Sequence, residues 1–228
     1  MPALSLDHDP HLARAVSAQT LEPRQQPTSL RIKISRDFRQ QHMLKHPFRS
    51  DFHTLAAHLY AGLLEGDPHV ISYIPRPFHL RIGRKHRTPD GYVVADNAPR
   101  RVYTITRGGT LDEAERLPLE AFFDQQGLHF ELISYESVFD RRSEAENWLE
   151  IIRILYRGRD LETGTEETEL IERIQRTGDL LLGDLVDPGD RERTYPLEIA
   201  IFRLLHRGLL KADLTNQPLD YQTRFTCS

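Results

Sequence analysis

Apolar residues recur at helical spacing between residues 51 and 65, where Phe52, Leu55, Leu59 and Leu63 share one face. This pattern predicts an amphipathic helix, which the turn sequence Gly66-Asp67-Pro68 ends. Short runs of β-forming residues follow and predict strands. These runs cover residues 70–73, 78–82 and 91–94, with a basic turn at 83–86 between the second and the third.

A second set of elements follows from residue 101. The segment RVYTIT at 101–106 alternates β-forming residues and predicts a strand, and residues 117–126 predict a helix closed by Gly127. Residues 129–134 predict a further strand, which a helical crossover would place parallel to its predecessor. A helix over 143–157 completes the pattern, with Trp148 and Ile152 on its buried side. These elements predict an α/β fold, a mixed sheet with helices on its faces.

The composition changes after Gly158, where the acidic stretch 159–168 is typical of a linker. Helices are predicted beyond it at 167–176, 180–185 and 196–206, followed by β segments at 209–214 and 221–226. Helices followed by a two-stranded ribbon are the plan of a winged helix-turn-helix. We therefore predict a flexible arm over 1–28 with a short helix at 11–18, a main domain over 29–160 and a winged-helix domain over 161–228.

Composition indicates a globular protein, with 39% hydrophobic and 28% charged residues. The single cysteine, Cys227, permits no disulfide framework within the chain, so we expect a cytoplasmic protein. No apolar run approaches the length of a membrane span, and the first residues lack the apolar core of a signal peptide. We therefore expect neither a membrane partner nor secretion.

Charge is distributed unevenly, although the formal net charge is only −4. Residues 31–107 carry fourteen Lys and Arg against six Asp and Glu, whereas residues 111–169 carry six against sixteen. A basic front half and an acidic middle suit a protein that meets phosphates on one face and a protein partner on another. The alternative is that both runs are solvated surface.

An ordered series of short motifs runs through the main domain. No single motif is specific, since a Pro-Asp pair alone is a common turn element. The ordered set resembles TnsA, the endonuclease subunit of heteromeric transposases, over about residues 45–226. The motifs are Thr54-Leu55-Ala56-Ala57-His58, Asp67-Pro68-His69-Val70, Arg76-Pro77-Phe78, Arg87-Thr88-Pro89-Asp90-Gly91, Tyr103-Thr104-Ile105-Thr106, Asn147-Trp148-Leu149 and the run from Leu204 to Leu214.

The resemblance implies a restriction-endonuclease-like fold with a C-terminal winged helix-turn-helix. In that family, carboxylates on a helix and on a strand hold magnesium, and a Lys steadies charge on the phosphate. Here Asp90 occupies the strand carboxylate position, while the other three positions fall on Ala57, Thr104 and Thr106. We expect Asp90, Thr104 and Thr106 to converge on one cleft with Ala57 on the facing helix. Because only Asp90 remains of the catalytic set, we expect an inactive nuclease without a cofactor, and Mg²⁺ only if activity survives.

Clustered cations are the candidates for contact with DNA. One group lies in the basic turn and its flanks, and the other surrounds the helix at 196–206; either group could instead be solvated, and the second could serve protein docking. The candidates are Arg81, Arg84, Lys85, Arg87, Arg191, Arg193 and Arg203. The histidines at 42, 46, 53 and 58 lack acidic or cysteine ligands at useful spacing, so we expect no metal site there.

The sequence therefore favours an inactive TnsA-like subunit of a transposition machinery that binds transposon ends. The resemblance implies two protein partners, a DDE-type transposase of the TnsB kind and an AAA+ regulator of the TnsC kind. Two alternatives stay open: an active metal-dependent endonuclease with relocated catalytic groups, and a stand-alone DNA-binding regulator or defence protein on the same fold.

Overall fold

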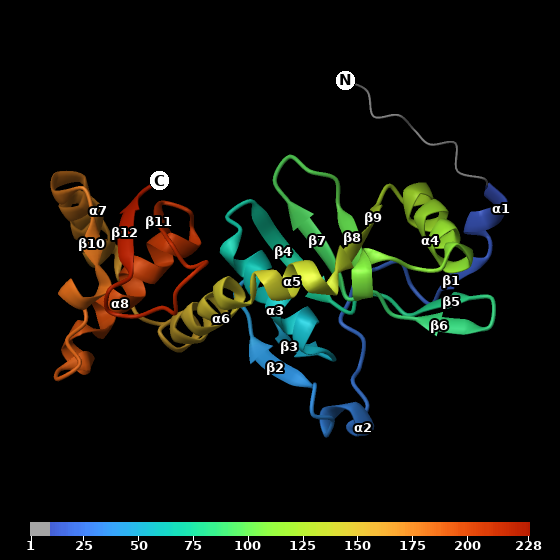
Figure 1. Ribbon diagram of the computed structural model, residues 1–228, viewed down its shortest axis with the longest axis horizontal. Helices are drawn as coiled ribbons and strands as arrows, with labels where there is room; N and C mark the ends of the chain where they lie inside the picture. The colour runs from blue at the N-terminus through green and yellow to red at the C-terminus, as the bar shows by residue number, and fades with distance from the viewer. Residues whose placement is uncertain (1–9) are drawn as a thin grey trace. The chain divides into compact units, whose positions relative to one another are not determined.

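The computed structural model describes residues 10–228, and the chain divides into two compact units. The first unit contains the residues up to Gln40 together with Ser50–Ala57 and Val70–Phe139. The second unit contains Gln41–Arg49, His58–His69 and Asp140–Ser228. Both strands and helices occur in this mixed α/β protein, as the sequence patterns predict (Figure 1).

A four-stranded mixed sheet, in the order β4-β7-β8-β9, is the centre of the first unit. The pairs β4–β7 and β7–β8 are antiparallel, whereas β8 and β9 are parallel, which confirms the predicted crossover. Helix α4 (Glu113–Gln125) makes that crossover, and the Asp112 side chain caps its start by accepting from the Ala114 N–H. The strands are β4 (Val70–Pro75), β7 (Gly91–Ala95), β8 (Arg101–Thr106) and β9 (His129–Ser134).

A second, three-stranded sheet has the order β1-β5-β6 and corrects two predictions. Strand β1 (Val16–Ala18) pairs with β5 (Leu80–Ile82), so this part of the predicted arm over 1–28 is a sheet strand. Residues 1–9 of that arm lie outside the described residues. Half of the predicted basic turn, Lys85 and His86, belongs to β6 (Lys85–Arg87), because cross-strand pairing with β5 extends almost to the tip at Gly83, whose φ is +57°.

Aromatic side chains from α4 and the four-stranded sheet, with aliphatic side chains from the three-stranded sheet, form the core of the first unit. Phe123 of α4 is fully buried and lies with its ring centre 5.9 Å from Phe78 and 5.6 Å from Phe130 of β9. Burial of each such side chain contributes roughly 1.5–3 kcal/mol. The core thus fixes α4 against the strands that carry the candidate site.

Several shorter elements complete the first unit or carry the chain between the two units. The predicted helix at 51–65 begins only at residue 55, because Thr54 Oγ1 accepts from the Ala57 N–H and the preceding residues pair as a strand. The bounds of these shorter elements are α1 (Pro10–Ala13), α2 (Leu30–Lys33), β2 (Arg39–His42), β3 (Arg49–Phe52), α3 (Leu55–Gly66), η1 (Arg107–Gly109) and α5 (Tyr135–Asp140).

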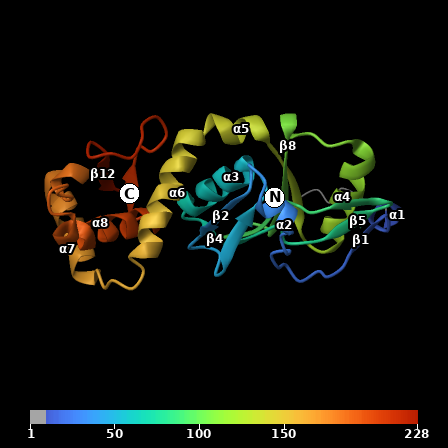
Figure 2. The same cartoon turned by 90° about the horizontal axis from the view of Figure 1, so that it is seen from below.

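Three long helices and a small antiparallel sheet, in the order β10-β12-β11, make up most of the second unit (Figure 2). The predicted helix at 180–185 is wrong, because Leu180 pairs with Phe225 and only one 3₁₀ turn follows. The bounds are α6 (Arg142–Arg157), α7 (Gly164–Thr177), α8 (Arg191–His206), β10 (Leu180–Leu181), η2 (Leu182–Asp184), β11 (Leu210–Ala212) and β12 (Arg224–Cys227).

Helix α6 belongs to the second unit, whereas the sequence patterns predict a boundary only at residue 160. A Cβ on Gly158, directly after α6, would lie 2.3 Å from Ile199 Cδ1 of α8, so the two backbones approach closely here. Buried Asn147 of α6 donates to the carbonyl groups of Leu214 and Gln217, both at 2.8 Å. Among residues 10–228, no helix is both long and apolar enough to cross a membrane.

Candidate functional site

Asp90 lies immediately before β7, and three backbone hydrogen bonds fix it there. Its carbonyl oxygen accepts from the Arg76 N–H at 3.0 Å, and its own N–H donates to the Tyr103 carbonyl at 2.9 Å. Its carboxylate oxygen Oδ2 accepts from the Ile105 N–H at 2.7 Å. The carboxylate is therefore held against β8 in a defined orientation.

A pocket of about 270 Å³ opens at this carboxylate. Thr104 and Thr106 lie two residues apart on β8 and reach the same face, as the strand period requires. Both threonines present hydroxyl groups at the positions where the sequence resemblance implies an acidic or amide group and a Lys. The pocket is lined by Leu80, His86, Arg87, Thr88, Pro89, Asp90, Thr104, Ile105, Thr106, Leu111 and Leu119.

The pocket contains an unusual polar atom. Thr106 Oγ1 is buried, and among residues 10–228 no hydrogen-bond partner is found for it. A buried hydroxyl group without a partner costs about 1–3 kcal/mol, so it marks a place where a ligand or water would stabilise the fold.

Ala57 does not share this pocket. Its side chain is buried in the first turn of α3, and it is not among the pocket-lining residues. The expectation that Ala57 faces the cleft from α3 is therefore not met, since the residue is enclosed among neighbouring side chains.

Burial dominates the electrostatics of Asp90. It raises the pKa of the carboxyl group from 3.8 to about 6, while the Ile105 N–H bond and the charge of Arg76 act in the opposite direction. Asp90 is thus mainly ionised at pH 7 and takes up a proton in mildly acidic solution.

A polar network beside Asp90 was not foreseen from the sequence. The Arg76 guanidinium donates to Thr28 Oγ1 at 2.8 Å and to the Gln26 carbonyl at 3.0 Å. Arg76 also has a left-handed φ of +51°, which is uncommon for a residue with a side chain. Burial lowers the pKa of Arg76, and the charges of Asp51 and Asp90 oppose that shift. Arg76 therefore serves as a counter-charge to both carboxylates.

His53 lies in the same network. Its Nε2 is 3.2 Å from Thr28 Oγ1, and burial together with the charge of Arg76 lowers its pKa to about 4. The imidazole is therefore neutral at pH 7. The only sequence signal for this network was the Arg76-Pro77-Phe78 motif, which gave no indication of Asp51 or His53.

The donor set at the pocket does not fit a magnesium site. Mg²⁺ needs hard, mostly anionic oxygen ligands, and Asp90 is the one carboxylate among the lining residues. Among the residues that the structure describes, no cluster of three or more His, Cys, Asp or Glu side chains could hold a metal ion. The neighbouring carboxylate Asp51 accepts from Gln40 Nε2 at 2.5 Å, which occupies one of its oxygens.

The predicted DNA-contacting cations of the hairpin make intramolecular contacts. Lys85 Nζ donates to Glu115 Oε1 at 2.6 Å, and Arg87 Nε donates to Glu115 Oε2 at 2.7 Å. Arg81 Nε donates to the Gly83 carbonyl at 2.8 Å, whereas Arg84 is exposed at the tip. Since buried Glu115 compensates two of the positive charges, the hairpin offers less free charge than its sequence suggests.

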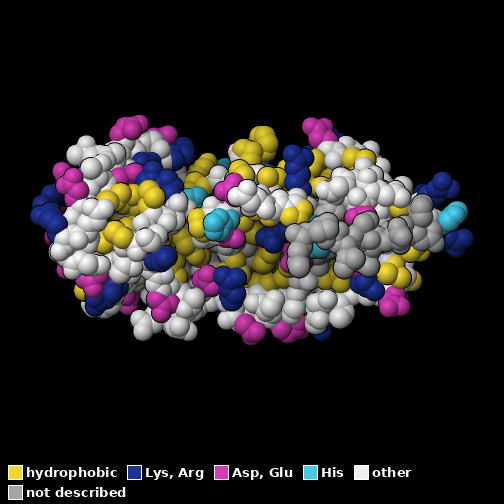
Figure 3. Space-filling view, turned by 90° about the horizontal axis from the view of Figure 1, so that it is seen from above, with side chains coloured by type: hydrophobic (Ala, Val, Ile, Leu, Met, Phe, Trp, Pro, Cys, Tyr) yellow, Lys and Arg dark blue, Asp and Glu magenta, His cyan; other side chains and the backbone are white. Residues whose placement is uncertain are grey.

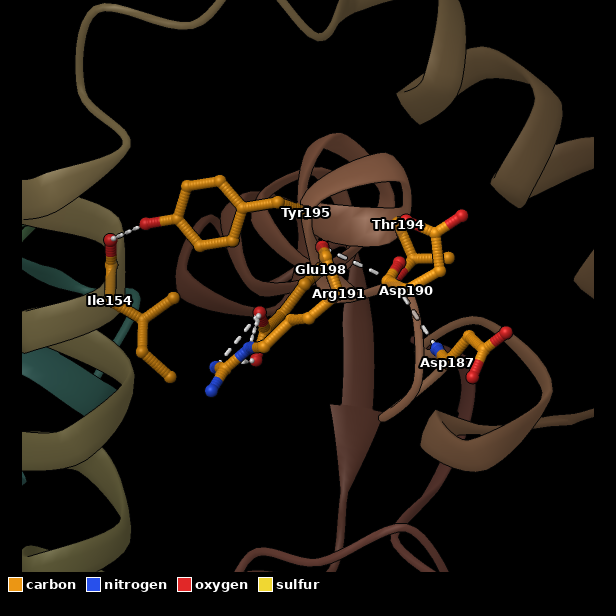
Figure 4. A network of polar contacts seen from close by, with 7 residues as sticks. All are labelled: Ile154, Asp187, Asp190, Arg191, Thr194, Tyr195 and Glu198. Carbon is orange, nitrogen blue, oxygen red and sulfur yellow. Dashed lines mark hydrogen bonds and ion pairs between the residues drawn. The ribbon is translucent and has the colours of Figure 1, made fainter.

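The predicted cations of the second unit are engaged as well. Arg191 forms a salt bridge of 2.8 Å with buried Glu198 (Figure 4), and Arg193 forms one of 2.9 Å with Asp190. Arg203 donates to Thr163 Oγ1 at 2.6 Å and to backbone carbonyl groups, including that of Leu161 at 2.7 Å. Arg203 thus fastens the connection between α6 and α7, a structural function that the sequence did not indicate.

Basic and acidic side chains are interspersed over the face of the molecule drawn in Figure 3. Comparison with models of known protein families and with curated proteins found no match to this chain.

Proposed function

We propose that this chain is a TnsA-like subunit of a DNA transposition machinery that binds transposon-end DNA and has lost nuclease activity. On this proposal, the four-stranded sheet with α4 is a restriction-endonuclease-like domain. The helices α6–α8 with their small sheet would then be a winged helix-turn-helix.

One observation carries the proposal: Asp90, Thr104 and Thr106 line a single pocket beside the paired strands β7 and β8. Loss of activity would leave such a pocket. It keeps one carboxylate, and the two strand positions that would complete the catalytic set carry hydroxyl groups. The positive charge of Arg76 partly balances the buried Asp90 carboxylate, so the pocket keeps its one carboxylate without a metal ion.

The partners follow from the resemblance and not from a contact in the structure. A DDE-type transposase of the TnsB kind would cut and join the other strand, and an AAA+ regulator of the TnsC kind would bind this subunit. Loss of cutting here would favour replicative, cointegrate-type products.

The first test is a nicking assay on transposon-end DNA with Mg²⁺ or Mn²⁺, with DNA binding measured on the same samples. We expect binding without metal-dependent nicking above background, and no change in nicking with Asp90→Ala. Robust nicking by the unmodified protein that Asp90→Ala abolishes would overturn the proposal in favour of an active endonuclease. Failure to bind DNA would overturn both readings.

Restoring the missing groups gives a gain-of-function test. The double variant Thr104→Glu, Thr106→Lys adds a second carboxylate and a cation to the pocket, and we expect weak Mg²⁺-dependent nicking from it. Adding Asp90→Ala to the double variant should remove that activity. A double variant that folds and binds DNA but never nicks would count against a nuclease origin of the pocket.

A further inference from the structure

Residues 29–37 form a short projecting loop, here called the basic loop, in the first unit. It contains α2 and extends away from the four-stranded sheet (Figure 1). None of the four residues of α2 is buried. Backbone hydrogen bonds within the loop, such as Ile34 N–H to the Leu30 carbonyl at 3.2 Å, give it an ordered local structure.

Both ends of the basic loop are fastened at one side chain. Before the loop, Thr28 Oγ1 lies 3.2 Å from His53 Nε2; after it, the Phe38 ring lies 6.4 Å from the His53 ring. Arg39 Nη1 also donates to the Arg36 carbonyl at 2.7 Å. A compact surface loop with closely held ends is a frequent form of functional loop, because it presents its side chains without a large ordering cost on binding.

The loop presents cations and aliphatic side chains, together with one carboxylate, that of exposed Asp37. Arg31, Lys33 and Arg36 are exposed, and among residues 10–228 no ion pair is found for any of them. In this they differ from Lys85 and Arg87, which share Glu115. Leu30 and Ile34 are apolar, yet 80% and 84% of their surfaces are exposed. The loop thus presents two exposed aliphatic side chains beside three exposed cations.

Duplex DNA fits this combination better than the other surfaces a basic loop could meet. Cations that lack a carboxylate partner release counterions when they contact phosphates, and apolar side chains beside them can enter a minor groove. A membrane would require a longer amphipathic helix than the four residues of α2. A protein partner would require a contiguous apolar patch, whereas here the two aliphatic side chains are separated by cations.

We infer that the basic loop is a DNA-contacting element, in which Arg31, Lys33 and Arg36 bind backbone phosphates while Leu30 and Ile34 contact the minor groove. This inference rests on the proposed DNA-binding function and identifies the surface that carries it. It places the main backbone contacts away from the hairpin at Gly83.

The test measures binding of a short mixed-sequence duplex over a range of salt concentrations, using the full chain. We expect the triple variant Arg31→Ala, Lys33→Ala, Arg36→Ala to weaken binding about tenfold or more at ~0.1 M salt and to make the slope of log K against log salt shallower by up to ~2.7. The variant Leu30→Ser, Ile34→Ser should weaken binding but leave that slope unchanged. The control is Arg14→Ala, Arg24→Ala, Arg100→Ala, which removes the same charge from exposed positions elsewhere in the first unit.

Each outcome separates the inference from the function on which it rests. If the unmodified protein binds no DNA, the proposed function fails. If it binds DNA and the basic-loop variant keeps its affinity and slope, or loses no more than the control, the inference alone is overturned. If the loop instead drives sedimentation with phosphatidylserine vesicles while DNA binding is unaffected, the inference is also overturned, in favour of a lipid surface.

Discussion

The carboxyl group of Asp90 carries an electrostatic cost that depends on pH. Its pKa of about 6 in the folded protein lies above the ordinary value of 3.8, so the folded state binds the proton more tightly than the unfolded state. The free energy of unfolding should therefore fall as pH rises through the interval between these two values. Above it, the cost of the buried charge is fully present, at most about 3 kcal/mol.

Asp90→Asn should remove this dependence, because the amide oxygen can still accept from the Ile105 N–H while the charge is gone. We expect the stability of the variant relative to the parent to increase between pH 4 and 6, measured by urea unfolding at several pH values. Asp96→Asn makes the same chemical change at an exposed position and serves as the control. If the free energy of unfolding depended on pH in the same way for the parent and Asp90→Asn, burial would not raise the pKa of Asp90.

At this scale, the sequence predicted part of the site well. The convergence of Thr104 and Thr106 follows from the two-residue period of a strand, and Asp90 is adjacent to that strand's partner. The network of Asp51, His53 and Arg76 could not be predicted in the same way. Its contacts join residues such as Thr28 and Arg76 that are 48 positions apart, and no local pattern encodes them.

At the scale of elements, the hairpin β5–β6 is fastened to the first turn of α4 by one carboxylate. Hydrogen bonds from Lys85, together with those from Arg87, lower the pKa of Glu115 and outweigh its burial. Its stabilising contribution is thus present above the ordinary glutamate pKa and is lost as pH falls through the lower, folded value. Because Lys85 and Arg87 are largely exposed, solvent screening limits this contribution to about 1 kcal/mol.

Glu115→Gln should therefore lower the free energy of unfolding by about 1 kcal/mol at neutral pH and by less in acid. It should also strengthen DNA binding if the hairpin touches phosphates, because Lys85 and Arg87 would lose their anionic partner. Glu113→Gln, on the same turn but with an exposed side chain, is the matched control for urea unfolding and DNA titration. Equal effects of the two changes would mean that Glu115 does not fasten the hairpin.

Elements with a strong periodic pattern were predicted closely, and those without one were missed. The strand at 101–106 coincides with β8, and the helix at 143–157 begins one residue late relative to α6. In contrast, β2 and β6 have the sequences RQQH and KHR, in which apolar and polar residues do not alternate. Such strands owe their conformation to a pairing partner distant in sequence, so local reasoning cannot find them.

On the scale of the whole molecule, the chain passes between its two units several times instead of once. The second unit takes Gln41–Arg49 and His58–His69 from the front half of the sequence. Reading the sequence from one end to the other favours contiguous domains, which is why the predicted boundary at residue 160 excluded α6. The physical reason for the difference is that α6 and the end of α3 bury apolar and polar groups against the C-terminal helices.

Glu65 of α3 illustrates this dependence. It is completely buried, accepts from the Leu44 and Lys45 N–H groups at 3.0 Å each, and lies 3.1 Å from His206 Nε2 of α8. A Cβ on neighbouring Gly66 would lie 2.2 Å from the Trp148 ring of α6, so helix and ring are in close contact. Glu65, Gly66 and Trp148 all lie outside residues 161–228, and Glu65 contacts α8 through His206.

We therefore predict that residues 161–228 do not fold as an independent domain. Separating them from α6 would expose apolar surface of α8, including that of Ile199, which is fully buried and lies against Gly158 at the end of α6. Each such side chain returned to water costs roughly 1.5–3 kcal/mol, and a few of them exceed the stability of a small domain. The measurement compares thermal unfolding by circular dichroism and amide proton dispersion for the 161–228 fragment and the full chain. A cooperative transition and dispersed spectrum from the fragment would contradict the prediction and restore the boundary at residue 160.

The full-chain variant Gly66→Ala supplies a complementary test without any truncation. It forces a methyl group against the Trp148 ring, so we expect it to lower the melting temperature of the full chain.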